Sequence, residues 1–272
     1  MISIIQSKIM KDAVKNKRMI RFLKALFATC FWVGVWALAS RAVGKELLIP
    51  SPLVVLSRIG GLVVTKPFWI KTGVSLLRVL GGFAAGLVGG TVLSVLASVS
   101  EIAEALITPF IRIIRSTPVT SFIILVMLWI SYTFVPVFIA GLLVTPIMYM
   151  NLREGIIETD KNLLEVAGIF RFGKWKTVRV VYIPSVKPYF VSAAVTSLGL
   201  AWKAGIASEV LSLPSNSVGR EIYYSKLYLE TPDLFAWTVV VVIFSFFFEK
   251  LFEIFVKNRK KEKEAVKENE DN

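Results

Sequence analysis

Long apolar stretches separated by short polar segments dominate this chain. The apolar run from Phe22 is too long for the hydrophobic region of a signal peptide, so we expect it to remain as a first membrane span. A helix needs about 20 apolar residues to cross a bilayer core about 30 Å thick. The pattern therefore predicts an all-α integral membrane protein with six transmembrane helices. They are expected at about residues 22–40, 73–99, 118–132, 134–150, 190–208 and 234–255.

The composition agrees with a membrane protein and removes several kinds of chemistry. Hydrophobic residues make up 55% of the chain, and the mean hydropathy is +0.68. Histidine, the commonest general base and zinc ligand, is absent, and Cys30 is the single cysteine. One thiol allows neither an internal disulfide nor a thiolate metal cluster. We therefore expect no catalytic residue, no metal site and no cofactor bound by this chain.

The net charge of +13 is distributed as a topology signal. Cytoplasmic loops of membrane proteins carry an excess of Lys and Arg. If both termini lie inside, 22 of the 32 Lys and Arg residues face the cytoplasm and seven lie in the two long outer loops. We therefore expect cytoplasmic termini, and nucleic acid is not an expected partner. The predicted organisation is a basic N-terminal arm (1–21), a six-span domain (22–255) with a cytoplasmic loop at 151–189, and a charged cytoplasmic tail (256–272).

The first outer loop contains Pro50, Ser51 and Pro52 ahead of an apolar segment. Proline is favoured in the first turn of a helix, so a helix is expected to start here. Two interpretations remain open for it. It is either a helix lying along the outer surface of the membrane or an ordinary helix packed within the loop.

A basic and aromatic segment lies between the fourth and fifth expected spans. It reads EVAGIFRFGKWKTVRVVYIP from Glu165 to Pro184. Apolar Val166, Ile169 and Phe170 lie here among positively charged side chains, an arrangement that suits docking onto a partner. The segment resembles the cytoplasmic EAA loop of ABC importer permeases. In that loop a Glu-Ala-Ala sequence is followed by a glycine and later by an apolar stretch that ends in proline.

The resemblance extends to most positions of the motif. Glu165, Val166 and Ala167 occupy the Glu-Ala-Ala positions, and Pro184 follows Glu165 by nineteen residues, the family's spacing. The family's glycine is replaced by Arg171, while glycines occur at 168 and 173. Since a glycine allows a turn between two short helices, we expect that the turn has moved or is built differently in this chain.

Four further blocks extend the resemblance over about residues 45–255. The five blocks are IPSP (49–52), SLLRVLGGFAAG (75–86), TPFIRIIRSTP (108–118), EVAG to IP (165–184) and AWKAGIASEVL (201–211). In this order they are similar to the nitrate, sulfonate and taurine branch of ABC importer permeases. The resemblance implies the type I ABC importer permease fold and a homodimer of six-span subunits in the inner membrane of a prokaryote. It also implies ATPase subunits that bind ATP and Mg²⁺ on the cytoplasmic side, and a substrate-binding protein outside. The solutes of this branch include sulfonates, taurine, nitrate, bicarbonate and some pyrimidine or flavin precursors, and a lysine in the fifth expected span favours a small anion among them.

The resemblance makes the 151–189 loop the element that couples the permease to the ATPase, with Glu165 near the start of a short helix. Residues 168–174 also satisfy GxxxxGK, the beginning of a P-loop. A tryptophan stands where a P-loop needs Ser or Thr for Mg²⁺, and no buried strand precedes it, so no nucleotide site is expected. The expected coupling residues are Glu165, Val166, Ala167, Gly168, Phe170, Arg171, Gly173, Lys174, Trp175 and Pro184.

Small and ionisable residues inside the expected spans are the remaining candidates. Gly82, Gly86 and Gly90 recur every four residues, a spacing that lets two helices approach closely. Lys203 and Glu209 are costly in lipid unless they face a cavity or a partner. Six helical positions correspond to about 600° of rotation, so these two side chains point about 120° apart and are not expected to pair. Each is a candidate for the translocation pathway or the dimer seam.

Two other functions are compatible with a multi-pass membrane protein. An ion-coupled secondary transporter often shows broken helices and repeated halves, and the sequence has no convincing internal repeat. An intramembrane lipid-modifying enzyme needs convergent acid–base or nucleophilic groups at membrane depth, and no acidic pair lies within an expected span. The sequence favours a permease subunit of an ATP-driven importer over both alternatives.

Overall fold

Helices account for all regular secondary structure in the computed structural model, which describes residues 2–248 and 250. The expected charged tail and the last residues of the expected sixth span lie outside the described residues. Within them, five helical segments are long and apolar enough to cross a membrane, and a bent pair of shorter helices is a sixth candidate. The five are Leu23–Val43, Lys66–Val99, Val135–Ile157, Lys174–Ser212 and Thr231–Phe248.

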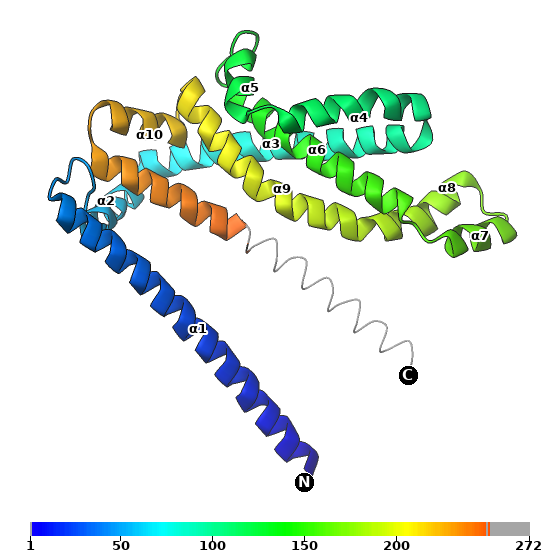
Figure 1. Ribbon diagram of the computed structural model, residues 1–272, viewed down its shortest axis with the longest axis horizontal. Coiled ribbons are helices and arrows are strands. Elements are labelled where there is room, and N and C mark those ends of the chain that lie inside the picture. Colours follow the sequence, from blue (N-terminus) through cyan, green and yellow to red (C-terminus); the bar gives the residue numbers. More distant parts are fainter. Residues whose placement is uncertain (1, 249, 251–272) are drawn as a thin grey trace.

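The first helix, α1 (Ile2–Val43), is continuous and includes both the expected N-terminal arm and the expected first span. It leaves the other helices at an angle and approaches them near its C-terminal end (Figure 1). There the Nε1–H of Trp36 donates to the carbonyl of Pro50 at 3.1 Å, and its ring stacks on Phe235 with centroids 5.8 Å apart. Large apolar side chains between Leu23 and Val35 of α1 are exposed, as in a helix that faces lipid or another chain.

The helix expected after Pro50 is present as α2 (Pro52–Val63), which confirms the predicted start. Pro52 lies in its first turn, and Ser51 caps it by accepting a hydrogen bond from the N–H of Val54 at 3.4 Å. On α2, Arg58 forms an ion pair with Asp233, and this hydrogen-bonded pairing raises the pKa of the Arg58 guanidinium above its ordinary value. The α2 helix is thereby attached to the helix Thr231–Phe248.

The centre of the molecule is formed by α3 (Lys66–Val99), α6 (Val135–Ile157) and α9 (Ile183–Ser212), which pack on one another. The helix Thr231–Phe248 covers one side of this core. Trp202 of α9 is 1% exposed, and its Nε1–H donates to the carbonyl of Val241 at 3.0 Å. Phe68 of α3 stacks on Trp237 with ring centroids 5.2 Å apart. Large aromatic side chains therefore fasten the last described helix to the core.

The expected third span, 118–132, is wrong in its bounds. Residues 119–126 form a short helix, α5 (Val119–Val126), and turns follow it. The preceding segment, expected as part of a loop, forms α4 (Glu101–Ser116), which runs back along α3 and also contacts α6 (Figure 1). The axes of α4 and α5 differ by 104°. Pro118 explains the break, because it disfavours helical backbone at Thr117, which is extended (φ −85°, ψ 134°).

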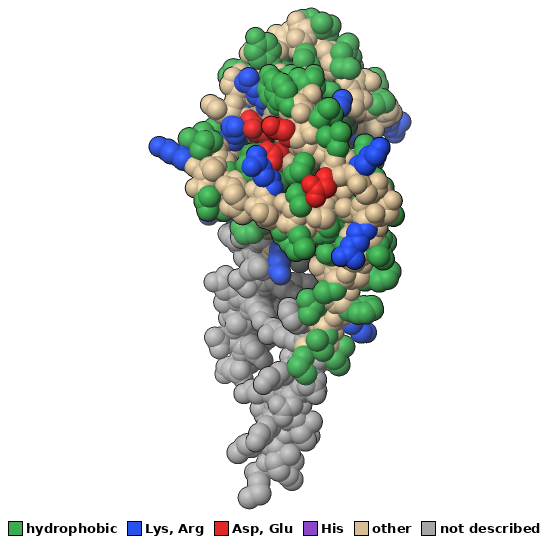
Figure 2. Space-filling model, turned by 90° about the vertical axis from the view of Figure 1, so that its left-hand side faces the viewer, with side chains coloured by type: hydrophobic (Ala, Val, Ile, Leu, Met, Phe, Trp, Pro, Cys, Tyr) green, Lys and Arg blue, Asp and Glu red, His purple; other side chains and the backbone are tan. Residues whose placement is uncertain are grey.

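The two ends of the molecule carry different elements. At one end lie α7 (Lys161–Ile169) and α8 (Lys174–Thr177), and at the other lie α2 and α10 (Val218–Leu227) (Figure 1). The end with α2 and α10 presents acidic and basic side chains close together (Figure 2). One ion pair there joins Lys71 of α3 to Glu221 of α10 at 2.7 Å. This ion pair links α10 to α3. The α7–α8 end consists of short helices that lie between the end of α6 and the start of α9.

Candidate functional site

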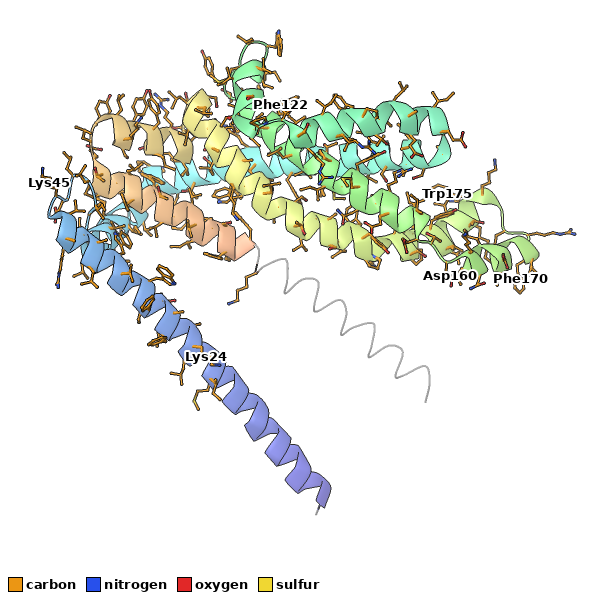
Figure 3. All side chains as sticks on the ribbon, in the orientation of Figure 1. Lys24, Lys45, Phe122, Asp160, Phe170 and Trp175 are labelled. Atoms are coloured by element: carbon orange, nitrogen blue, oxygen red, sulfur yellow. The ribbon has the colours of Figure 1, made fainter. Side chains whose placement is uncertain are left out.

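The first candidate site is the segment between α6 and α9, which carries α7 and α8 at the end of the helical bundle (Figure 3). The α7 helix begins after Asp160, whose carboxylate accepts a hydrogen bond from the N–H of Asn162 at 2.8 Å. This N-cap satisfies one of the free N–H groups at the helix start. Phe170 and Trp175 lie further out, away from the central helices (Figure 3).

The turn between α7 and α8 is built around Arg171, whose φ of +50° lies in the left-handed region. The N–H of Arg171 donates to the carbonyl of Gly168 at 2.9 Å, and the N–H of Phe172 donates to the carbonyl of Ala167 at 2.8 Å. These two bonds form a Schellman motif, in which glycine is preferred at the position that Arg171 occupies. The turn has therefore not moved to a neighbouring glycine. It lies where the family has glycine, and an arginine adopts the left-handed conformation.

The outward face of this segment is apolar. Ile169, Phe170 and Trp175 are 78%, 70% and 79% exposed, and Val166 is 46% exposed. The neighbouring Ala167 is turned inward and is 3% exposed. A concentration of exposed large apolar side chains is typical of an interaction site.

Basic and aromatic side chains lie beside this apolar face. The Nζ of Lys176 is 4.0 Å from the ring centroid of Phe172, a cation–π distance. The rings of Phe170 and Phe172 have centroids 6.3 Å apart, and Lys174 is exposed. An apolar centre with a charged rim is the usual arrangement of a protein–protein interface.

Glu165 does not lie where we expected it. The α7 helix begins at Lys161 and is capped by Asp160, so Glu165 lies exposed in the middle of the helix. The first turn of α7 contains no acidic residue. The expected position of Glu165 near the helix start is therefore wrong, and its carboxylate lies too far along α7 to interact with the helix dipole, whose effect falls off within the first turn.

The basic end of the segment continues directly into the membrane helix. A π-helical turn, η1 (Val178–Tyr182), joins α8 to α9 and is closed by a bond from the N–H of Ile183 to the carbonyl of Val178. Pro184 follows in the first turn of α9. Because proline has no N–H, a local π turn is one way to pair the carbonyls that it leaves free. The helical segment that corresponds to the expected fifth span, Lys174–Ser212, therefore starts well before residue 190.

The second candidate site surrounds the carboxylate of Glu209 near the end of α9, which is fully buried. Its Oε2 accepts hydrogen bonds from the hydroxyl of Ser75 at 2.7 Å and from the N–H of Gly219 at 3.1 Å. The Oγ of Ser75 accepts a further bond from the N–H of Val218 at 2.9 Å. A buried charge needs such partners, so this set explains how the carboxylate is tolerated.

Glu209 and Ser75 thereby attach α10 to α9 and α3. The N–H groups that they accept belong to the first two residues of α10, which have no partner within the helix. Arg78 of α3 donates to the carbonyl of Ser215 at 2.8 Å and lies 3.5 Å from Oε1 of Glu209. The cluster fixes the turn between α9 and α10.

Lys203 has different surroundings from Glu209. It lies on α9 between the buried Trp202 and Ala204, and its own side chain is exposed. The roles expected for Lys203 and Glu209 in the pathway or the dimer seam stay predictions.

Gly82, Gly86 and Gly90 lie where α3 crosses α6. A Cβ at Gly82 would lie 2.1 Å from a backbone carbonyl of α6, and a Cβ at Gly86 or Gly90 would lie 2.6 or 2.5 Å from a side-chain Cβ of α6. Real Cβ atoms do not approach so closely. These positions therefore permit direct backbone contact between the two helices.

Several residues of these sites were not predicted from the sequence. Asp160 stands directly before an amphipathic helix, which is a recognisable N-cap signal. Arg78 is an ionisable residue in an apolar stretch, which by itself indicates a partner. Ser75 has no comparable signal, because the carboxylate that it binds is 134 residues away.

Comparison with known proteins gives consistent matches. Residues 82–261 match the family described as "Binding-protein-dependent transport system inner membrane component". The putative aliphatic sulfonates transport permease protein SsuC of Bacillus subtilis is 23% identical, over 85% of this chain and 86% of that protein. The nitrate import permease protein NrtB of Synechococcus elongatus is 23% identical, over 73% of this chain and 75% of that protein.

Solved structures show the same fold. A chain of an amino acid ABC transporter has a TM-score of 0.59 at 16% identity, covering 69% of this chain and 92% of that chain. A chain of the MetNI methionine ABC transporter in an inward-facing conformation has a TM-score of 0.55 at 18% identity, covering 70% of this chain and 93% of that chain. At these identities the likeness describes the architecture alone.

Proposed function

Because this chain belongs to the family of binding-protein-dependent transport system inner membrane components, we propose that α7 and α8 dock on a partner ATPase and that the transported solute is a small anion. The expected fold and branch of ABC importer permeases are confirmed. The chain is a non-catalytic, multi-pass subunit of the inner membrane, and a separate ATPase subunit hydrolyses ATP. Family membership also implies a substrate-binding protein as a partner.

The exposed apolar face of α7 and α8 is the observation that carries the docking proposal. Phe170 and Trp175 are exposed at the end of the molecule, and basic side chains flank them. Burying about 200–300 Å² of these two rings would contribute roughly 5–7 kcal/mol before the cost of association. Aromatic anchors of this kind carry much of the binding energy in protein interfaces.

The solute proposal rests on what the relatives are named for. Two of them are named as permeases for aliphatic sulfonates and for nitrate, and a third, from Synechococcus elongatus, for bicarbonate. All three solutes are small anions. We assign Lys203 to the pathway or to the seam of a permease homodimer, because it is an exposed lysine on a membrane helix and a positive charge on the pathway would attract an anion.

Coupling follows from the way α7 is connected. Residues 158–160 join α6 to α7, and η1 joins α8 to α9, so both ends of the docking segment lead into core helices. Closure of the ATPase dimer on ATP would displace the segment and change the relative stability of inward-open and outward-open states. In this proposal the α7–α8 end and both termini face the cytoplasm.

Co-purification tests the docking proposal. Phe170→Ala and Trp175→Ala should each reduce the amount of ATPase recovered with the tagged permease at least ten-fold, at unchanged permease abundance. Trp32→Ala removes an equally exposed aromatic ring from α1 and serves as the matched control. Recovery of the ATPase at the wild-type level with both α7–α8 variants would show that the docking element lies elsewhere.

Uptake by proteoliposomes separates the importer from an ion-coupled secondary transporter. With the binding protein and the ATPase present, uptake of a sulfonate or nitrate should require ATP and should persist when ionophores collapse the ion gradients. Uptake that needs an ion gradient and no ATP would contradict the proposal.

A further inference from the structure

A cavity of about 390 Å³ lies between α4 and α6, near the end of α6 that leads to α7. Its volume is within the range of about 300–1,000 Å³ that is typical of small-molecule sites. Ile111 and Tyr149 form a buried floor, 2% and 3% exposed. The hydroxyls of Tyr149 and Thr108 are hydrogen-bonded to each other at 2.8 Å, which closes the floor. Nothing in the proposed docking or coupling uses this cavity.

Three guanidinium groups line the cavity. Arg112 and Arg115 are three residues apart on α4 and therefore project from the same side of the helix. Within the described part of the chain, neither has a carboxylate oxygen within 4.0 Å, and Arg115 contacts the sulfur of Met150, a weak acceptor. Arg153 of α6 pairs with Glu104, but its Nε is buried without a hydrogen-bond partner among the described residues. A buried donor without an acceptor is destabilising.

Two carboxylates lie on the same cavity. Glu154 lies in the last turn of α6, Glu158 is the residue directly after the helix, and both are exposed to solvent. They pair with none of the three arginines within 4.0 Å in the described part of the chain. The cavity therefore presents separate cationic and anionic groups over an aromatic floor. This arrangement suits a ligand that carries both an oxyanion and an ammonium group.

We propose that this cavity binds a zwitterionic ligand that joins a tetrahedral phosphate to a primary ammonium group, as the phosphoethanolamine headgroup of a membrane lipid does. The phosphate lies on the guanidinium groups of Arg112, Arg115 and Arg153. The ammonium lies on Glu154 and Glu158. Charged groups near the end of a membrane helix lie at headgroup level, where basic pockets between helices bind lipid phosphates. The inference rests on the proposed function for placing this end at the cytoplasmic leaflet.

The position of the cavity connects it to the docking segment. Glu158 lies in its wall and is followed, after one residue, by Asp160, the cap of α7. An occupied cavity would therefore hold the last turn of α6 against α4 at the point where α7 begins.

Native mass spectrometry of the delipidated permease–ATPase complex tests the site. Phosphatidylethanolamine is titrated against phosphatidylglycerol, which has the phosphate without the ammonium. We expect Arg115→Gln to weaken binding of both lipids at least five-fold. Glu158→Gln, a conservative change at an exposed position, should weaken binding of phosphatidylethanolamine alone. Lys187→Gln is the control for Arg115→Gln, because it removes an exposed positive charge from α9, outside the cavity. It should change the binding of neither lipid.

Soluble phosphoethanolamine identifies the source of the ligand. Its displacement of phosphatidylethanolamine at millimolar concentration would assign the site to a soluble zwitterion, and failure to displace would assign it to the lipid. Wild-type binding of both lipids by Arg115→Gln would overturn the site. An equal loss of both lipids in Glu158→Gln would overturn the zwitterionic assignment. Trp175→Ala should lose the ATPase and still bind both lipids as the wild type does. This result would show that the cavity and the docking segment are tested independently.

Discussion

Replacing Arg171 by glycine should stabilise the docking segment. An L-residue in the left-handed region is disfavoured by about 1–2 kcal/mol, and Arg171 has φ +50° at the position where a Schellman motif prefers glycine. Part of this gain, about 0.5–1 kcal/mol, is lost because glycine has more conformational entropy than arginine in the open state. The net gain expected for the closed turn is therefore about 1 kcal/mol, which corresponds to a roughly five-fold change in an opening equilibrium.

Hydrogen exchange of the intact complex measures this equilibrium locally. Amides of residues 161–172 that are bonded within α7 and its C-terminal turn should exchange about five-fold more slowly in Arg171→Gly. Arg171→Ala is the matched control, because it removes the same charge and leaves a side chain at the strained position. It should show no gain in protection.

The two variants also separate strain from charge. If the guanidinium contacts the ATPase, Arg171→Gly and Arg171→Ala should weaken the complex equally, whatever their exchange rates. If the arginine serves the turn alone, Arg171→Gly should retain full transport. Equal exchange in Arg171→Gly and Arg171→Ala would refute the assignment of strain to this residue.

Three further predictions concern the membrane helices, and a fourth concerns the start of α7. Gly86→Ala should lower the free energy of unfolding of the purified permease by about 1–3 kcal/mol, because the added methyl group overpacks against α6. Gly89→Ala is the control and should be tolerated, because its added Cβ would be 3.6 Å from the nearest atom. Glu209→Ala should cost about 3–5 kcal/mol, seen as a lower melting temperature, and Glu209→Gln should cost less because it keeps an acceptor for α10. Lys203→Met should reduce uptake at normal membrane abundance, and full activity would exclude a pathway role. A cysteine replacing Lys161 in a cysteine-free background should resist impermeant reagents added to intact cells, and labelling there would reverse the topology.

Periodicity and hydropathy were sufficient to predict the features that depend on residues close together in the sequence. The start of α2 follows from Pro52, and the close approach of α3 and α6 was anticipated from glycines four residues apart. These signals are local, since a proline in a first turn or a small-residue stripe has the same physical effect in many contexts.

The bounds of the third span could not be predicted in the same way. The run from Pro118 to Tyr132 is apolar throughout, and hydropathy does not distinguish a helix from the turns that follow α5. The α4 segment was expected to be a loop because it contains Arg112 and Arg115. In the structure these arginines are on a helix and line a cavity, which their charge alone does not predict.

The candidate sites depended on contacts that a single sequence does not contain. Three glycine or arginine positions, 168, 171 and 173, could each have formed the turn after α7, and the backbone places it at the arginine. Glu209 was recognised as costly, but its partners on α3 and α10 could not be named, because they are brought together by folding.

The glycine contacts between α3 and α6 also determine how a displacement travels. Twenty-three helical residues give α6 a length of about 35 Å, and at Gly82, Gly86 and Gly90 no side chain of α3 separates the two helices. A movement imposed at α7 therefore tilts α3 and α6 as one rigid lever, and a small shift at the docking end becomes a comparable shift at the far end. Near its C-terminal end α1 contacts Pro50 and also Phe235 of the helix Thr231–Phe248, so it can remain in place while α3 and α6 tilt.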